Sequence, residues 1–328
     1  MAKCSLRIEL PEARDFVEPG GQLDVIVHVD CDARTKCNGL TLTRLWRTHG
    51  MGNRDTGDKR VEELFRGEWE PGTYAYPATI EFPHGPTSYH GKAINIDWYL
   101  VAEADVPFAF DPKAEEMVLM ADPRPPRGNA APSIWAPGPV KMSTNLGGCL
   151  IPSYIGLGVA AVLLATGTFA LGAVLGVVSA WLLLGSLRAG STVKALGHVA
   201  MEIHPSEVAP GEAFHVMLEL KPGSSVELNL IKLTLTSTER ATSGSGTTAK
   251  VHKQVAFHIE EVVAEDLRLV ASDRFDQETT FQLPVTAPVS FKASNNEIKT
   301  TLTLSIHPAK KTPVTHEAVL QVVPSPGA

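Results

Sequence analysis

A long stretch without a charged residue constrains this chain more than any other feature. No Asp, Glu, Lys or Arg occurs between Lys141 and Arg188, although charged residues make up 20% of the chain. The apolar centre of the stretch, residues 151–187, would be about 55 Å long as one straight helix. A single crossing of the hydrocarbon core needs only about 20 residues. The stretch is therefore too long for one crossing and long enough for two.

We predict a two-helix transmembrane hairpin at residues 150–188. Small and polar residues suit a short turn between two helices, and this turn is assigned to Thr166, Gly167 and Thr168. Small residues also recur every four positions along each arm, which allows close helix packing. These packing residues are Gly156 and Ala160 in the first arm, and Gly172, Gly176 and Ala180 in the second. The same faces could instead mediate homo-oligomerisation.

Basic residues flank the uncharged stretch on both sides. They are Arg124, Arg127 and Lys141 before it, and Arg188 and Lys194 after it. Basic flanks favour the cytoplasmic side of a membrane, and two cytoplasmic ends require an even number of crossings. We therefore expect a protein of the cytoplasmic membrane with both flanking domains in the cytoplasm. A re-entrant first arm, or one span with the domains on opposite sides, are the alternatives.

Outside this stretch the chain has the pattern of half-buried β-strands. Apolar residues alternate with polar ones, as in Leu23, Val25, Val27 and Val29, and Gly- and Pro-rich turns separate such runs. We predict an all-β fold of tandem antiparallel, immunoglobulin-like β-sandwiches around the hairpin. The expected divisions are a first sandwich at 1–120, a Pro-rich linker at 121–149, the hairpin, a linker at 189–197 and a second sandwich at 198–328.

The two flanking halves repeat one pattern. Val17-Glu18-Pro19-Gly20 opens a strand in the first half, and Val208-Ala209-Pro210-Gly211 opens one in the second. Later, Phe82-Pro83 with Ser88-Tyr89 matches Leu283-Pro284 with Ser290-Phe291. The spacing between matching motifs is nearly constant, which indicates a duplicated domain.

These motifs resemble the arrestin-like family. The Pro-Gly opener, Tyr74-Ala75-Tyr76-Pro77, and Thr87-Ser88-Tyr89-His90-Gly91 before a long strand are similar to the arrestin-like N-terminal domain, and the later half resembles the C-terminal domain. The pattern is most similar to bacterial sporulation-control-type members. The resemblance implies a tandem of sandwiches that acts as a scaffold for other proteins, often at a membrane surface. The inserted hairpin departs from the soluble members of the family.

No motif in the sequence carries catalytic chemistry. Gly156-Leu157-Gly158-Val159-Ala160-Ala161 has the spacing of a dinucleotide-binding loop but lacks the strand that must precede one. Cys31 and Cys37, with His28 or His49, do not have the usual spacing of zinc ligands. We therefore predict no catalytic, cofactor-binding or metal-binding residue, and not an enzyme. The four cysteines show no paired spacing, which favours a reducing compartment.

The expected function is that of a membrane-anchored, non-catalytic adaptor or scaffold at the cytoplasmic membrane face. Its partners would be other proteins and the lipid bilayer, with a homo-oligomer possible, whereas the net charge of −7 disfavours nucleic acid. Partners would bind at exposed sheet edges or concave faces, where an extended segment can add a strand. The alternatives are an accessory structural subunit of a membrane transport or secretion complex, and an enzyme with a site in a β-sandwich cleft.

Overall fold

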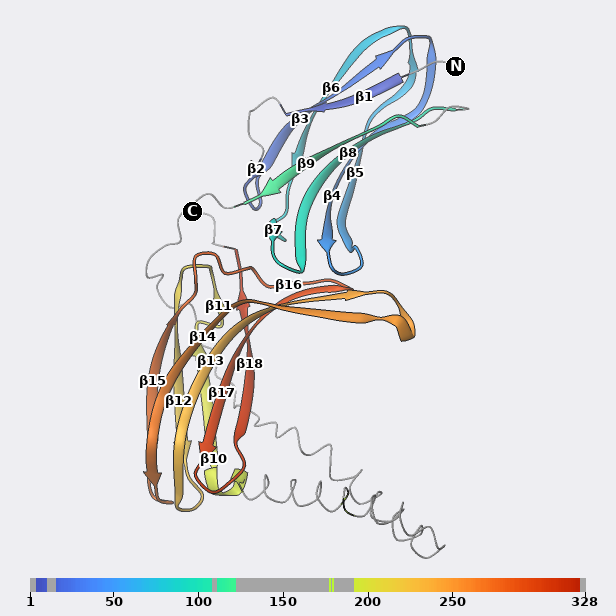
Figure 1. Cartoon of the computed structure of the whole chain (residues 1–328). Helices are drawn as coiled ribbons and strands as arrows, with labels where there is room; N and C mark the ends of the chain where they lie inside the picture. Colours follow the sequence, from blue (N-terminus) through green and yellow to red (C-terminus); the bar gives the residue numbers. More distant parts are fainter. Residues whose placement is uncertain are drawn as a thin grey trace, which may run out of the picture.

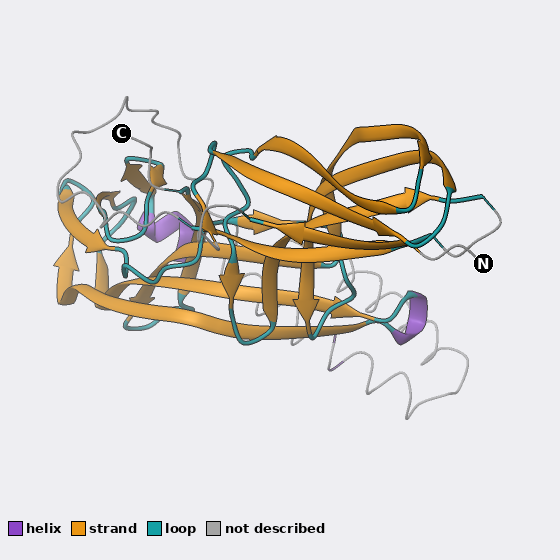
Figure 2. Ribbon diagram, turned by 90° about the horizontal axis from the view of Figure 1, so that it is seen from above, coloured by secondary structure: helices purple, strands orange, loops and turns teal. Residues whose placement is uncertain are grey.

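The computed structural model describes residues 4–10, 16–107, 111–121, 177, 179 and 192–324. Most of these residues lie in β-strands, which form two β-sandwiches that follow each other along the chain (Figure 1). In this part of the chain, helix is limited to short segments (Figure 2). The predicted β-sandwich architecture is therefore confirmed for the described residues.

The first sandwich contains two sheets. A three-stranded sheet has the order β1-β3-β6, and a six-stranded sheet has the order β2-β9-β8-β4-β5, with β7 paired to β8. The strands are β1 (Cys4–Glu9), β2 (Phe16–Val17), β3 (Gln22–Cys31), β4 (Thr35–Gly50), β5 (Thr56–Trp69), β6 (Gly72–Glu81), β7 (Tyr89–His90), β8 (Ile94–Asp105) and β9 (Lys113–Met120).

The second sandwich repeats this arrangement. Its three-stranded sheet has the order β10-β12-β15, and its six-stranded sheet has the order β11-β18-β17-β13-β14, with β16 paired to β17. The strands are β10 (His198–His204), β11 (Glu207–Val208), β12 (Ala213–Lys221), β13 (Val226–Ser243), β14 (Lys250–Leu269), β15 (Phe275–Gln282), β16 (Phe291–Lys292), β17 (Asn296–Pro308) and β18 (Val314–Val322).

Alternation along the strands builds a separate core in each sandwich. In β3, Leu23, Val25, Val27 and Val29 are buried, while the residues between them are more exposed. Because successive side chains of a strand point to opposite faces, one such strand contributes a row of four apolar side chains to the core. In the second sandwich, β12 does the same with Phe214, Val216, Leu218 and Leu220.

The duplicated sequence motifs have the same structural role in both halves. The main-chain N–H of Ser88 donates to the carbonyl of Met120 (2.8 Å), and the Ser88 Oγ accepts from the N–H of Met120 (2.9 Å). Ser290 makes the same two hydrogen bonds with Val322, at 2.8 and 2.9 Å. Each serine thus ties the segment before the short strand to the last strand of its own sandwich.

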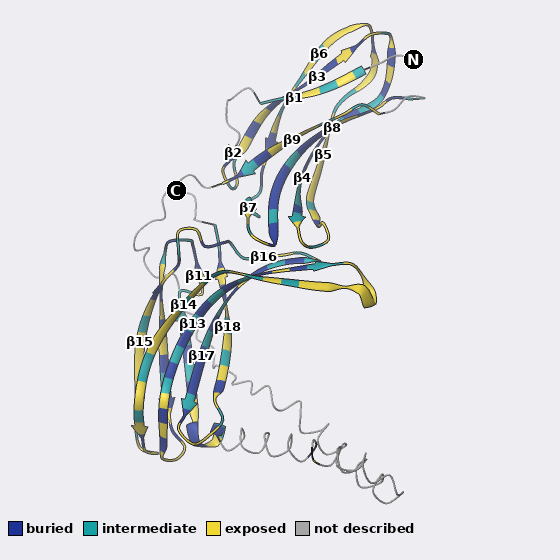
Figure 3. Cartoon of the chain, viewed as in Figure 1, coloured by how far each residue is buried: buried dark blue, intermediate teal, exposed yellow. Residues whose placement is uncertain are grey.

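Three strands of the second sandwich continue past its core. Figure 1 shows the β13–β14 hairpin bending away from the second sandwich and running beneath the first. The pairing of β13 with β14 shifts register between Ser237 and Thr238, and such a bulge bends a strand pair locally. Beyond the bend much of the hairpin is exposed (Figure 3). The far ends of β13, β14 and β17 therefore lie at the junction of the two sandwiches.

The predicted transmembrane hairpin is wrong. No helix in the described part of the chain is long and apolar enough to cross a membrane. The predicted location in a cytoplasmic membrane rested on that hairpin and is wrong with it. Absence of charge lowers the free-energy cost of entering lipid, but a crossing also needs one regular helix of about 20 residues, and the glycines that suggested packing faces lower helix propensity.

Most residues assigned to the hairpin lie outside the described residues. Among the predicted flank charges, only Lys194 is described, exposed in a short helical segment at 192–196 that leads into β10. The hairpin packing and turn residues and the other flank charges that lie outside are Gly156, Ala160, Thr166, Gly167, Thr168, Gly172, Gly176, Ala180, Arg124, Arg127, Lys141 and Arg188.

The expectation that the cysteines are unpaired is also corrected. Cys4 and Cys31 form a disulfide, whereas Cys37 is buried with a free thiol. Spacing gave no indication of the bridge, because the two residues are 27 positions apart. They meet because β1 and β3 pair antiparallel with Cys4 directly opposite Cys31. The argument for a reducing compartment from cysteine spacing therefore fails.

Candidate functional site at the junction of the two sandwiches

Apolar side chains from both sandwiches form a small cluster at the junction. Trp46 of β4 meets Phe291 of β16 edge to face, with ring centroids 5.4 Å apart. Burial of this cluster favours association of the two sandwiches, because both partners lose apolar surface to water. The buried members are Ala93, Ile94 and Ile96 from the first sandwich, and Ala241, Phe291 and Ile298 from the second.

A buried carboxylate of the second sandwich reaches into the first. Glu239 of β13 is only 1% exposed, and its Oε1 accepts a hydrogen bond from the Tyr89 hydroxyl at 2.9 Å. It also accepts from the main-chain N–H groups of Lys92 (3.2 Å), Ala93 (2.6 Å) and Ile94 (3.0 Å). A buried carboxylate is costly unless hydrogen bonds replace its water. The 92–94 segment of the first sandwich provides that replacement.

A second carboxylate makes the reciprocal contact. Asp55 of the first sandwich is buried, and its carboxylate accepts from the main-chain N–H of Asn295 at 2.9 Å and from its side-chain amide at 2.8 Å. The Asn296 amide donates to Asp55 at 2.8 Å, to the Thr48 hydroxyl at 3.0 Å and to the Asn53 carbonyl at 2.8 Å. The loop before β17 is thus held by the first sandwich.

The two contacts are related by the internal duplication. Thr48 is the β4 residue opposite Ile96 of β8, and Glu239 is the β13 residue opposite Ile298 of β17. Ile96 and Ile298 are separated by the same number of residues as Ser88 and Ser290. Thr48 of β4 and Glu239 of β13 are therefore equivalent buried polar residues. The loop before β8 receives the Glu239 carboxylate, and the loop before β17 receives the Asp55 carboxylate.

Burial governs the chemistry of Tyr89. Burial, together with its hydrogen bond to Glu239, raises the pKa of the Tyr89 phenol well above its ordinary value. The phenol therefore stays protonated in the alkaline range where an exposed tyrosine ionises, and it acts as a hydrogen-bond donor. Its role at the junction is to stabilise the Glu239 carboxylate.

A cleft of about 280 Å³ opens beside the junction. The duplicated motifs form its two walls, with Thr87, Ser88 and Tyr89 on one side and Val289, Ser290 and Phe291 on the other. The other lining residues are Pro86, Ile96, Met120, Ala121, Pro210, Val285, Thr286, Ala287, Pro288 and Pro324. The lining is thus mainly apolar with a few hydroxyls. The hydroxyl oxygens of Ser88 and Ser290 already accept main-chain hydrogen bonds.

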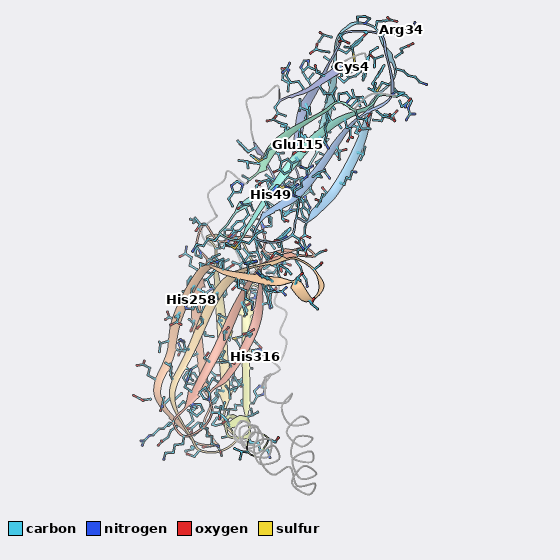
Figure 4. All side chains as sticks on the ribbon, turned by 45° about the vertical axis from the view of Figure 1, so that its right-hand side comes forward. Cys4, Arg34, His49, Glu115, His258 and His316 are labelled. Carbon is cyan, nitrogen blue, oxygen red and sulfur yellow. A yellow bond between two sulfur atoms is a disulfide. The ribbon has the colours of Figure 1, made fainter. Side chains whose placement is uncertain are left out.

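A group of charged and aromatic side chains connects β4, β8 and β9 of the first sandwich, and its members His49 and Glu115 are labelled in Figure 4, with His49 nearer the second sandwich. The Tyr99 hydroxyl lies 2.8 Å from His49 Nε2, and Arg47 pairs with Glu115 at 2.7 Å while stacking over the Tyr99 ring. Burial, with the nearby Arg54 charge, lowers the pKa of His49. His49 is thus neutral at physiological pH. These contacts join side chains of β4 to β8 and, over the Tyr99 ring, to β9.

The residues weighed as zinc ligands do not converge. Cys31 is bonded to Cys4, Cys37 is buried with the pKa of its thiol raised by burial, and His28 contacts Glu9 at 3.0 Å. No group of three or more His, Cys, Asp or Glu side chains in the described ranges is arranged to hold a metal ion.

The polar residues that join the two sandwiches, Glu239, Asp55 and Asn295, were missed by sequence reasoning, although one of them left a signal. In β13 the buried positions alternate through Leu233, Leu235 and Ser237 to Glu239, so a carboxylate stands where the pattern requires a core residue. Asp55 and Asn295 lie in loops, where no periodicity predicts burial.

No protein-family model matches this chain, and no curated protein matches it at a significant level.

Proposed function

We propose that this protein is a non-catalytic scaffold that binds other proteins, and that an extended segment of a partner docks in the junction cleft. The cleft carries the proposal, because its walls come from two different domains that buried hydrogen bonds hold in a fixed relation. A preorganised surface of this kind binds without the cost of ordering itself.

The size and chemistry of the cleft favour a peptide over a cofactor. Pockets for small molecules usually measure about 300–1,000 Å³ and enclose most of the ligand. A cleft of about 280 Å³ that is open to solvent suits one or two apolar side chains of a larger partner. Prolines and aromatic rings line it, and the Thr87 and Thr286 hydroxyls can bond to a partner's main chain. The resemblance to arrestin-like scaffolds is consistent with this proposal.

Site-specific photocrosslinking in the producing cell tests the proposal. A photoreactive amino acid replaces Thr87 on one wall or Val285 on the other, and covalent adducts are identified by mass spectrometry. We expect both positions to capture the same protein. Val270, an exposed valine in a turn after β14, is the matched control and should not capture it. Capture of no protein from either wall, or of the same proteins from Val270, would contradict the proposal.

A further inference from the structure

The last strand of the second large sheet has an open edge. β14 is the longest strand, and among the described residues it pairs only with β13. An edge strand presents main-chain N–H and C=O groups that can pair with another chain, and proteins protect such edges with Pro, short length, covering segments, bulges or charged side chains. β14 has bulges and charges, so only a neighbour whose charges are complementary can pair with it. β14 contains no Pro over its 20 residues.

Two bulges divide this edge into regular stretches. Ser237 pairs with Phe257 and Thr238 with Val255, which leaves Ala256 as an extra residue. Ile231 pairs with Ala264 and Lys232 with Val262, which leaves Val263 as another. Residues 250–255 and 257–262 are therefore two regular stretches of equal length.

The two stretches carry opposite charge. The first contains Lys250 and Lys253, and the second contains Glu260 and Glu261. No described carboxylate pairs with Lys250 or Lys253, and no described base pairs with Glu261. An antiparallel neighbour with the same sequence would set each basic stretch beside an acidic one. A parallel neighbour would instead set like charges together, which is destabilising.

The outward side chains of the two stretches also match. Directly opposed residues of a strand pair share a face, and the buried Glu239 and Ala241 mark the inner face of β13. The alternate β13 residues therefore mark the outer face, and their partners are the outward residues of β14. Those residues are Val251, Lys253, Val255, His258, Glu260 and Val262. The three valines are 48%, 48% and 49% exposed, respectively.

We propose that two copies of this chain associate through antiparallel pairing of their β14 strands, with Lys253 opposite Glu260 and Val251 opposite Val262 of the other copy. The same register places Val255 opposite His258, so every outward residue meets an outward residue. Two-fold symmetry forms each pair twice, as an isologous interface requires. Glu260 is held on this face by Lys232 Nζ at 2.8 Å and His258 Nε2 at 3.2 Å.

The corresponding edge of the first sandwich does not have these properties. β5 occupies the same place in the order β2-β9-β8-β4-β5. Its pairing with β4 shifts register three times, and several of its charges are paired within the same sandwich. These are Arg66 with Glu63, Arg60 with Glu81, and Glu68 with Arg34. The pairing of β14 also shifts register, twice, and its Glu260 and Arg268 pair within the second sandwich. In contrast to β5, however, its two regular stretches are of opposite charge and match each other when run antiparallel.

Mixed disulfide crosslinking of the full-length chain tests the register. Opposed residues of an antiparallel pair have Cα atoms about 4.5–5.5 Å apart, within the range of a disulfide. Residues 251 and 262 of one copy are about 35 Å apart along the strand. After mild oxidation, a mixture of Val251→Cys and Val262→Cys chains should give a crosslinked dimer, because the two introduced cysteines are opposed. Each variant alone should give only the background of the unmodified chain, because the introduced cysteines of its two copies lie far apart in the dimer. Equal crosslinking in all three samples would overturn the proposal.

Charge reversal tests the same interface without cysteine. Lys253→Glu and Glu260→Lys should each raise the dimer dissociation constant about tenfold, because each change affects two symmetric pairs. The double variant should recover the original value. Lys59→Glu, on the exposed edge of β5, is the matched control and should leave it unchanged. Sedimentation gives these constants. A monomer at all concentrations, or a double variant as weak as the single ones, would contradict β14 pairing while leaving the cleft proposal intact.

Discussion

The two sandwiches share a strand order and a serine anchor, yet they bring different side chains to the junction. The position opposite Ile96 in the first sandwich is Thr48, and the position opposite Ile298 in the second is Glu239. Both residues are 1% exposed. Glu239 accepts four hydrogen bonds from the other domain, whereas the Thr48 hydroxyl accepts only one, from the Asn296 amide, which also donates to Asp55. The two sandwiches thus share their strand order, but they contribute different polar side chains to the junction.

This inequality predicts that removing Glu239 destabilises the protein far more than removing Thr48. Glu239→Ala leaves the Tyr89 hydroxyl and three main-chain N–H groups without their acceptor, at a cost of about 3–5 kcal/mol. Thr48→Ala should cost about 1–2 kcal/mol, because it leaves the main-chain N–H of Asp55 without its acceptor while the Asn296 amide still donates to Asp55. Urea unfolding measures both free energies. Equal losses would mean that the two sides of the junction contribute alike.

The long Glu239 side chain also explains a difference between the two junction loops. A Cβ atom at Gly91 would lie 2.6 Å from the Glu239 carboxyl group, whereas the position equivalent to Gly91 in the second sandwich is occupied by Ala293. Gly91→Ala should therefore destabilise the protein by about 1–3 kcal/mol, as overpacking does. Ala293→Gly should cost about 0.5–1 kcal/mol, since it only adds main-chain freedom.

A double-mutant cycle shows whether Glu239 causes the Gly91 effect. In a Glu239→Ala background the carboxyl group is gone, so Gly91→Ala should lose most of its cost. The unfolding free energies of the four chains give the coupling. An unchanged cost in that background would show that Gly91 is required for the loop conformation and not for the space that Glu239 occupies.

Sequence reasoning predicted the strands and the duplication better than the contacts at the junction. The alternation in runs such as Leu23 to Val29 reports strands directly, because one face of a strand is buried. The short motifs around Ser88 and Ser290 predicted the duplication from sequence alone, and both serines make the same two hydrogen bonds to the last strand of their own sandwich. Such signals lie within one strand or one turn, which is why a single sequence reveals them.

Features that depend on long-range pairing could not be predicted. Cys4 meets Cys31 only through the register of β1 and β3, and Asp55 meets Asn295 only once both domains have folded. The error over the uncharged stretch had another cause, since composition sets the cost of entering lipid but not the length of a regular helix. Tyr89 and Phe291 stood in the duplicated motifs, and Glu239 was the one buried carboxylate of the junction within reach, as a charge at an inward position of β13.

The smallest change that tests the difference between the two sandwiches gives the first sandwich a residue of the second. Phe291 occupies the position that Tyr89 holds in the first sandwich, so Tyr89→Phe copies the second motif and removes only the hydroxyl that donates to Glu239. At pH 8 this should cost about 1.5–2 kcal/mol, the low end of the range for a hydrogen bond to a charged group, because Glu239 keeps its three main-chain donors.

The cost should then fall at alkaline pH, because the pKa of Tyr89 is raised in the folded protein, chiefly by burial. In the unfolded chain Tyr89 loses its proton near pH 10, whereas in the folded protein it keeps the proton to higher pH. The stabilisation that the Tyr89 hydroxyl gives to the folded protein is therefore complete below about pH 10. Above pH 10 it is lost, by at most about 1.4 kcal/mol per pH unit. Urea unfolding of both chains between pH 8 and 11 measures the difference and cancels the titration of other tyrosines. A difference that stays constant over this range would show that the Tyr89 hydroxyl is open to solvent, and the Glu239 carboxylate would then be stabilised by main-chain N–H groups alone.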